Sequence, residues 1–213
     1  MSLTILVTGF GPFPGAPFNP TGPLAQRAKR ARRPALADVK IVTHIFPTSY
    51  AAVDRELPAL IAKHKPDALL MFGLAPRARG LRVETRARNA LALLPDAGGA
   101  SLGRRAIAVG SPTSMKLRTP ARPLLAALRG LRPRVTLSRD AGRYLCNYLC
   151  WRVAETASTS TGLRLAAFIH VPPVSRKAAR QGARVLTSAK LERAAHAILA
   201  EFVQCLGSGG MRH

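Results

Sequence analysis

Acidic side chains are scarce in this sequence. Only 10 of its 213 residues are Asp or Glu, against 33 Lys and Arg, which gives a formal net charge of +23. Such a balance can indicate nucleic-acid binding. However, the basic residues are spread along the whole chain, and aromatic residues, which could stack on bases, make up only 5% of it. We therefore expect a basic, solvated surface rather than a nucleic-acid-binding function.

Cysteines are few, and long apolar runs are absent. The 3 cysteines are an odd number and do not form the disulfide framework of a small secreted domain. No apolar run approaches the ~20 residues needed to cross a bilayer. The N-terminus starts with a strand-like segment and lacks the basic region, apolar region and cleavage site of a signal peptide. These absences predict a cytoplasmic protein.

Strand-like and helix-like patterns alternate along the chain. Short apolar runs predict strands at residues 3–8, 39–46, 68–72, 135–138 and 165–171. Apolar residues at helical spacing predict helices at residues 24–33, 50–64, 120–131, 144–156 and 188–206. Residues 104–109 are expected to form a short strand or part of a hairpin, whereas residues 77–89 fit neither pattern clearly.

This alternation predicts an α/β fold with a largely parallel sheet covered by helices on both faces. A chain of 213 residues is long enough to bury a substantial core in one domain. We expect this single domain to span residues 1–206. Residues 207–213 are expected to form a disordered C-terminal tail.

Cys146 is the candidate nucleophile. It lies in the segment 138–151, after a turn at Gly142 and in the first turns of a predicted helix. The positive end of a helix favours a thiolate, and its free N–H groups can stabilise an oxyanion. Most free cysteines are instead small buried hydrophobes, which we expect of Cys150 and Cys205. Cys146 and Cys150 alone do not make a metal site, because no second pair of ligands completes it.

His170 is the candidate acid–base group. It ends an apolar strand, and strand ends form the ligand-binding edge of an α/β sheet. A histidine there can accept the thiol proton and later protonate a leaving amine, but its second ring nitrogen needs an orienting partner. Glu84 and Asp140 are both candidates. Spacing alone favours a surface ion pair for Glu84, among its neighbouring arginines, and a capping role is open to Asp140.

The loop after the first strand is rich in glycine and proline. It does not match the G-x-G-x-x-G phosphate-binding pattern, and its prolines remove amide donors that an anion would need. Phe10 and Phe13 lie in this loop region. They either pack into the core or form the wall of a small apolar pocket.

Five segments of the chain resemble motifs of the pyroglutamyl peptidase I (pyrrolidone-carboxylate peptidase) family of cysteine peptidases. In the family these motifs read TGFxPFGG…NPS, PTx(F/Y), ExxAxN, AGxxxCN and FIHxP. The matching segments occur in the same order at Thr8–Phe13 with Asn19, Pro47–Tyr50, Glu84–Asn89, Ala141–Asn147 and Phe168–Pro172. The resemblance therefore covers nearly the full length of the chain.

The resemblance implies removal of an N-terminal pyroglutamyl residue from peptides through a thioester intermediate. By position, Cys146 would be the nucleophile, His170 the general acid and base, and Glu84 the group that orients His170. The residues expected to grip the lactam or shape its pocket are Phe10, Phe13, Asn19, Leu74, Tyr144 and Leu145. The implied fold is a single three-layer α/β/α sandwich, often assembled as a homotetramer, with no metal or cofactor.

The chain departs from the family pattern at three places. Leu74 replaces a glutamine that the family uses near the lactam, and losing a polar contact lowers selectivity. Residues 91–96 and 173–177 also differ from the family. Two alternatives therefore stay open: an amidase acting on a related lactam or N-acyl substrate, and a family member with little or no activity whose basic surface binds an acidic polymer.

Overall fold

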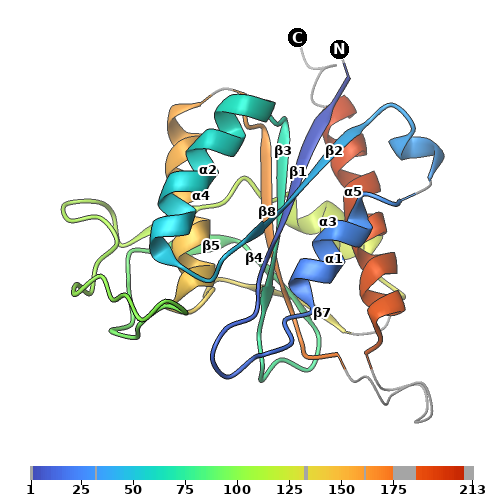
Figure 1. Ribbon diagram of the computed structural model, residues 1–213. Coiled ribbons are helices and arrows are strands. Elements are labelled where there is room, and N and C mark those ends of the chain that lie inside the picture. Colours follow the sequence, from blue (N-terminus) through green and yellow to red (C-terminus); the bar gives the residue numbers. More distant parts are fainter. Residues whose placement is uncertain (1, 32, 132–133, 161, 175–185, 209–213) are drawn as a thin grey trace.

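A central sheet of six strands organises the computed structural model of the chain (Figure 1). The structure describes residues 2–31, 33–131, 134–160, 162–174 and 186–208. The strands are β1 (Thr4–Phe10), β2 (Lys40–Phe46), β3 (Ala68–Leu74), β4 (Leu81–Glu84), β7 (Val135–Ser138) and β8 (Leu165–Val171). Their order across the sheet is β2-β1-β3-β8-β4-β7.

The sheet is mixed, although most of its strands are parallel. β2, β1, β3 and β8 run in one direction, whereas β4 pairs with β8 in the antiparallel sense and with β7 in the parallel sense. The segment that fitted no clear pattern, 77–89, contains β4 and the short strand β5 (Arg86–Arg88). β5 forms a separate antiparallel pair with β6 (Ser114–Lys116).

Helices cover both faces of the sheet, which gives three layers (Figure 1). One face carries α1 (Thr21–Ala28), α3 (Ala121–Ala127) and α5 (Ser188–Ser208), and the other carries α2 (Tyr50–His64) and α4 (Leu145–Thr159). A short 3₁₀ turn, Pro34–Leu36, precedes β2. The predicted three-layer α/β/α sandwich with a largely parallel sheet is thereby confirmed.

Two apolar cores lie on opposite faces of the sheet. Successive residues of a strand point to opposite faces, so Ile5 of β1 joins the core under α1, α3 and α5, whereas Leu6 joins the core under α2 and α4. Both side chains are fully buried. The long apolar runs of β1, β3 and β8 are typical of strands covered on both sides, which explains why they could be read from the sequence.

Several elements differ in their bounds from the sequence predictions, among them α3, which spans Ala121–Ala127 where 120–131 was expected, and three further differences stand out. α1 ends at Ala28, so the basic run up to residue 33 is not part of it. The strand or hairpin expected at 104–109 is wrong, because Ile107 and Ala108 donate their backbone N–H groups to the Asn89 side chain within a loop. α5 continues through Gly207 and Ser208, which we assigned to the tail; residues 209–213 lie outside the described residues.

Across the described ranges, no helix has both the length and the apolar character that crossing a membrane requires.

Candidate active site

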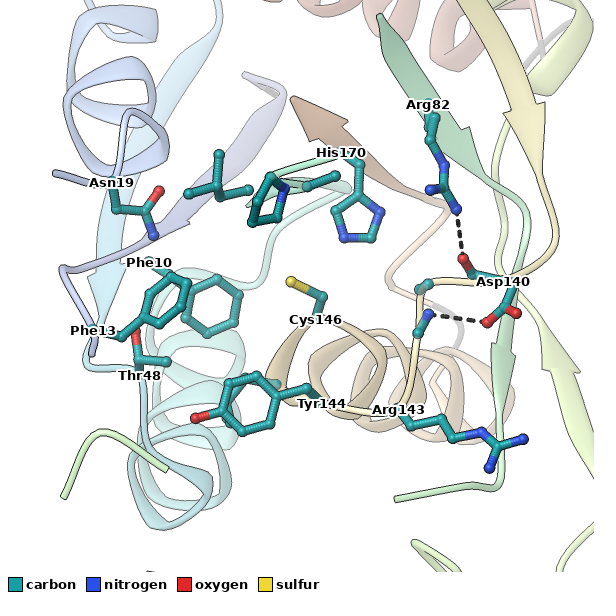
Figure 2. A pocket seen from close by; sticks show the side chains of 16 residues that line it. Phe10, Phe13, Asn19, Thr48, Arg82, Asp140, Arg143, Tyr144, Cys146 and His170 are labelled. Atoms are coloured by element: carbon teal, nitrogen blue, oxygen red, sulfur yellow. Dashed lines mark hydrogen bonds between the residues drawn. The ribbon is translucent and has the colours of Figure 1, made fainter. Parts of the chain in front are cut away.

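A cavity of about 510 Å³ lies where β1, β3 and β8 end and α4 begins (Figure 2). This carboxyl edge is where ligands bind in open α/β sheets. Phe10 and Phe13 lie at one end of the cavity, and Arg82 and Asp140 lie at the other (Figure 2). The side chains of Cys146 and His170 lie between these two ends.

His170 and Glu84 form a hydrogen-bonded pair within the sheet. They lie on the adjacent strands β8 and β4, whose antiparallel register places Arg82 opposite His170 and Phe168 opposite Glu84. The Nδ1 atom of His170 lies 2.8 Å from Oε1 of Glu84, and the Glu84 side chain is fully buried. The ion pair with a neighbouring arginine that spacing favoured for Glu84 does form, with Arg82, but its expected place at the surface is wrong, because the carboxylate is buried.

The Glu84 carboxylate is buried but not isolated. Its Oε1 atom lies 3.4 Å from Nη2 of Arg82, in addition to its contact with His170. Its Oε2 atom has no hydrogen-bond partner among the described residues. A buried carboxylate costs free energy unless charged partners compensate it, so this arrangement favours a positively charged ring on His170.

The electrostatics of His170 agree with that arrangement. Burial by itself lowers the pKa of His170, because it disfavours the charged ring. The side chains of Cys146 and Glu84 outweigh burial and raise the pKa of His170 to about 9. The ring of His170 is therefore protonated at neutral pH.

Cys146 is the second residue of α4. The preceding turn includes Gly142, whose φ of 86° is a conformation that glycine adopts without strain. The N–H groups in the first turn of a helix have no partner within the helix. They are therefore free to bind an oxyanion that forms next to the Cys146 sulfur.

Asn147 fixes the start of α4 to the neighbouring hairpin. Its Oδ1 atom accepts a hydrogen bond of 2.8 Å from the N–H of Arg88, and its Nδ2 atom donates to the carbonyl oxygens of Arg88 and Ala90. The side chain is fully buried. The sequence predicted no role for this residue, although its place directly after Cys146 in the Ala141–Asn147 motif was a signal for one.

Gly73 of β3 makes room for the nucleophile. A Cβ atom at this position would lie 2.8 Å from the Cys146 Sγ atom and would clash with the ring of Phe168. Phe168 is fully buried and packs edge-on against the His170 ring at a centroid distance of 5.0 Å. Glycine is therefore required at position 73 because a side chain would not fit there, and not because of its backbone conformation.

We expect Gly73→Ala to displace both the Phe168 ring and the Cys146 sulfur. Overpacking a core costs about 1–3 kcal/mol of unfolding free energy, and a shift of about 1 Å at reacting atoms can cost roughly 100-fold in rate. Chemical denaturation and kcat/KM measure the two effects. Gly207→Ala is the matched control, because its new Cβ meets no atom within 4 Å. Unchanged kcat/KM in Gly73→Ala would contradict this account.

Apolar side chains form the other end of the cavity. Phe10, at the end of β1, is 3% exposed, and Phe13 is half-buried in the following turn. The half-buried Tyr144 donates a hydrogen bond from its hydroxyl to the carbonyl of Pro95. Leu74 and the buried Leu145 also line this cavity. The structure thus brings the predicted apolar pocket residues to the same cavity as Cys146.

Asn19 shapes the loop that carries the phenylalanines. Its Nδ2 atom donates to the carbonyl of Gly11, and its Oδ1 atom accepts from the N–H and the hydroxyl of Thr21. Thr48, which sequence reasoning did not assign to the site, lines the cavity and donates from Oγ1 to the same Gly11 carbonyl. Its place within the Pro47–Tyr50 motif was the signal for it.

Asp140 does not act as the partner of His170. Its carboxylate is exposed, pairs with Nη1 of Arg88 at 2.9 Å, and accepts a hydrogen bond from the N–H of Gly142. It therefore stabilises the turn before α4, which was its alternative interpretation. In the part of the chain that the structure describes, no group of three His, Cys, Asp or Glu side chains is placed to hold a metal ion.

The two other cysteines differ from each other. Cys150 is fully buried in the core, as expected, and burial raises the pKa of its thiol well above the ordinary value. Cys205 is half-buried on α5, so its assignment to the core is wrong. Burial and the nearby Glu201 carboxylate raise the pKa of Cys205 to about 11. Both groups therefore stay protonated thiols at neutral pH.

Comparisons with known proteins agree on one family. A family model described as pyroglutamyl peptidase matches residues 3–206. The pyrrolidone-carboxylate peptidase of Thermococcus litoralis is 31% identical over 169 residues, which is 79% of this chain and 76% of the relative. That of Pyrococcus furiosus is 29% identical over 171 residues, 80% of this chain and 81% of the relative.

Solved structures give the same result. The pyrrolidone carboxyl peptidase from Thermococcus litoralis superposes with a TM-score of 0.81 at 25% identity, covering 97% of this chain and 96% of its own. The pyrrolidone carboxyl peptidase from Fervidobacterium islandicum reaches a TM-score of 0.82 at 25% identity, covering 95% of this chain and 99% of its own.

Proposed function

The chain belongs to the pyroglutamyl peptidase family, and we propose that it is a cysteine peptidase that removes pyroglutamyl residues from the N-termini of peptides. One observation carries the proposal. The ring of His170 lies between the buried carboxylate of Glu84, 2.8 Å from Nδ1, and the side chain of Cys146. This is the nucleophile, base and orienting group that thiol acyl transfer requires.

In the first half of the reaction, the Cys146 sulfur attacks the carbonyl carbon of the pyroglutamyl residue. The free N–H groups at the start of α4 bind the oxygen of the tetrahedral intermediate. His170 donates its proton to the nitrogen of the leaving peptide, and the C–N bond breaks. The products are a thioester on Cys146 and a peptide with a new N-terminus.

In the second half, His170 acts as a base. It takes a proton from a water molecule, whose oxygen attacks the thioester carbonyl. The C–S bond breaks, pyroglutamate leaves, and the thiolate–imidazolium pair is restored. Glu84 holds the ring in one orientation through Nδ1 in both halves, so the opposite nitrogen always faces the reacting atoms.

The apolar end of the cavity suits a flat, uncharged lactam ring. Phe10 and Phe13 provide aromatic surfaces, and Leu74 adds an aliphatic one. An amide of an open-chain amino acid would bring a charged ammonium group to this end, where no described lining residue is acidic. The names of the relatives also favour a pyroglutamyl peptidase over an amidase with another substrate or a binding protein without activity.

The substrate assignment is tested with fluorogenic amides of pyroglutamate, proline and glutamine. We expect kcat/KM for the pyroglutamyl amide to exceed the others by about 100-fold or more. Proline has the same ring without the carbonyl, so its ring nitrogen is a charged ammonium, and apolar walls disfavour that charge by roughly this factor. Equal rates for the prolyl amide would overturn recognition of the lactam. An N-acyl amino-acid amide is assayed beside these three. Hydrolysis of that amide without hydrolysis of the pyroglutamyl amide would favour the amidase alternative.

Three further expectations stay predictions. We propose a cytoplasmic location, assembly into a homotetramer, and no nucleic-acid-binding role despite the net charge of +23. The sedimentation coefficient of the purified protein tests the assembly. A DNA-binding titration at physiological salt tests the lack of a nucleic-acid-binding role, because nonspecific binding of a basic protein weakens steeply as salt rises.

A further inference from the structure

The two ends of the catalytic cavity have opposite chemical character. Phe10 and Phe13 lie on one side of the Cys146 sulfur, and Arg82, Asp140 and Arg143 lie on the other (Figure 2). His170 stands on the side of the charged residues (Figure 2). Because a general acid must reach the leaving nitrogen, the peptide beyond the lactam leaves the cavity on the charged side.

This side has an excess of positive charge. The guanidinium group of Arg143 is exposed and makes no hydrogen bond or ion pair with any described residue. Asp140 is the acidic residue among the described lining residues, but its carboxylate already pairs with Arg88 and accepts from the N–H of Gly142. Its charge is therefore compensated locally, whereas that of Arg143 is not.

A second hollow continues this cationic surface. It has a volume of about 220 Å³, and Arg79, Arg82, Arg134 and Thr136 are among the residues that line it. Arg82 lines both cavities, because β4 lies between β8 and β7. No described residue that lines the hollow is acidic, and the exposed guanidinium groups of Arg79 and Arg134 have no partner within the described ranges.

Arg82 itself is not available to a ligand in the same way. Its Nη2 atom donates to Oγ of Ser138 at 3.0 Å and to the carbonyl of Asp140 at 2.8 Å, and it also approaches Glu84. It joins the catalytic pair to the turn before α4. Among the described residues, the cationic groups without an ion pair at this end therefore belong to Arg143, which lines the catalytic cavity, and to Arg79 and Arg134, which line the adjoining hollow.

We infer that this protein prefers pyroglutamyl peptides that carry acidic residues directly after the pyroglutamyl residue. The inference rests on the proposed function and adds a substrate class to it. Arg143 is the specificity-determining residue for the first of these positions, and Arg79 and Arg134 serve positions further along. One exposed ion pair changes binding by less than about fivefold, but several like charges around one cavity reinforce each other and speed association.

Two peptide amides that differ only in Glu or Gln after the pyroglutamyl residue test the inference. The measured quantity is the ratio of their kcat/KM values, Glu over Gln. We expect a ratio of about 10 at low ionic strength, falling toward 1 near about 1 M salt, where screening is strong. In Arg143→Gln the low-salt ratio should fall to about 3, a loss within the range of one exposed ion pair.

Arg129→Gln is the matched control. It removes one exposed positive charge just after α3, on the opposite face of the sheet, and should keep the wild-type ratio. Turnover of both peptides with a wild-type ratio near 1 would overturn the inference and leave the proposed function intact. Hydrolysis of neither peptide would overturn the function and the inference with it. An unchanged ratio in Arg143→Gln would overturn the assignment of that residue.

Discussion

Cys146→Ala is expected to lower kcat for a pyroglutamyl amide by about 10⁴-fold or more. The expectation follows from the loss of the group that forms the thioester, and removal of a nucleophile in comparable peptidases has effects of about 10⁶-fold. The residue is only half-buried, and alanine fits the first turn of α4, so the unfolding transition should change little. Steady-state kinetics and chemical denaturation measure the two quantities.

Cys205→Ser is the matched control for this substitution. Cys205 is the other half-buried cysteine, lies on α5 and hydrogen-bonds to the Glu201 side chain. Its replacement should leave kcat unchanged. Iodoacetamide should inactivate wild type and Cys205→Ser alike. Substantial turnover by Cys146→Ala would mean that another group attacks the substrate.

Glu84→Gln lowers kcat by a factor of about 10³ to 10⁴. Replacing the carboxylate of a Ser-His-Asp triad by an amide costs about 10⁴-fold, chiefly because the histidine takes the wrong tautomer. The same reasoning applies here, since Oε1 of Glu84 accepts the Nδ1 proton of His170 and the carboxylate is fully buried. Glutamine is the conservative choice, because it nearly keeps the volume while removing the charge.

The pH profile separates this role from a merely structural one. Cys146 and Glu84 together raise the pKa of His170 to about 9, against the effect of burial. Without the carboxylate the protonated ring loses stabilisation, so its pKa falls. The alkaline limb of the kcat/KM profile should therefore move to lower pH in Glu84→Gln. If kcat/KM of Glu84→Gln were lower at every pH but fell at the same alkaline pH as in wild type, this role would be contradicted.

A second histidine–glutamate pair provides the control. Nε2 of His44 lies 2.9 Å from Oε2 of Glu56, a separation close to that of the catalytic pair, but both side chains are partly exposed and lie outside the catalytic cavity. Glu56→Gln should leave kcat and the pH profile unchanged. Equal losses in the two variants would show that the effect of Glu84→Gln is structural.

Patterns within single segments predicted most of the fold. The helix Tyr50–His64 and the strands Val135–Ser138 and Leu165–Val171 have the predicted boundaries. Each has an apolar pattern set by its own core contacts, on one face for the helix and on both faces for Leu165–Val171, and such patterns are visible in the sequence. The strand predicted at 104–109 was wrong because its apolar residues do not reflect a strand. The side chain of Asn89, distant in the sequence, accepts backbone hydrogen bonds from this segment instead.

Residue spacing alone could not identify the carboxylate that pairs with His170. Glu84 lies among arginines in the sequence, and such a segment is typical of a surface. The structure buries it because β4 is inserted between β8 and β7, a non-local pairing that no local pattern reveals. The resemblance to a family pointed to Glu84 rather than Asp140, and the observed pairing explains that choice physically.

The cationic exit from the cavity shows a similar limit. Arg79, Arg134 and Arg143 are separate in the sequence, where they add only to an overall basic composition. Arg143 lines the catalytic cavity, and Arg79 and Arg134 line the adjoining hollow, which shares Arg82 with that cavity because β4 lies beside β7. Composition alone favoured a general solvated surface, whereas the structure places these three charges in two hollows that share Arg82.

The antiparallel pairing of β4 with β8 makes catalysis a sensitive reporter of folding. β4 has only four residues, and a slip of one residue along β8 would turn Glu84 to the opposite face of the sheet. Such a misfolded chain would keep the helices and most strands, so circular dichroism would scarcely distinguish it from the native protein. Specific activity after refolding therefore counts the molecules with native strand registry, which spectroscopic recovery overestimates.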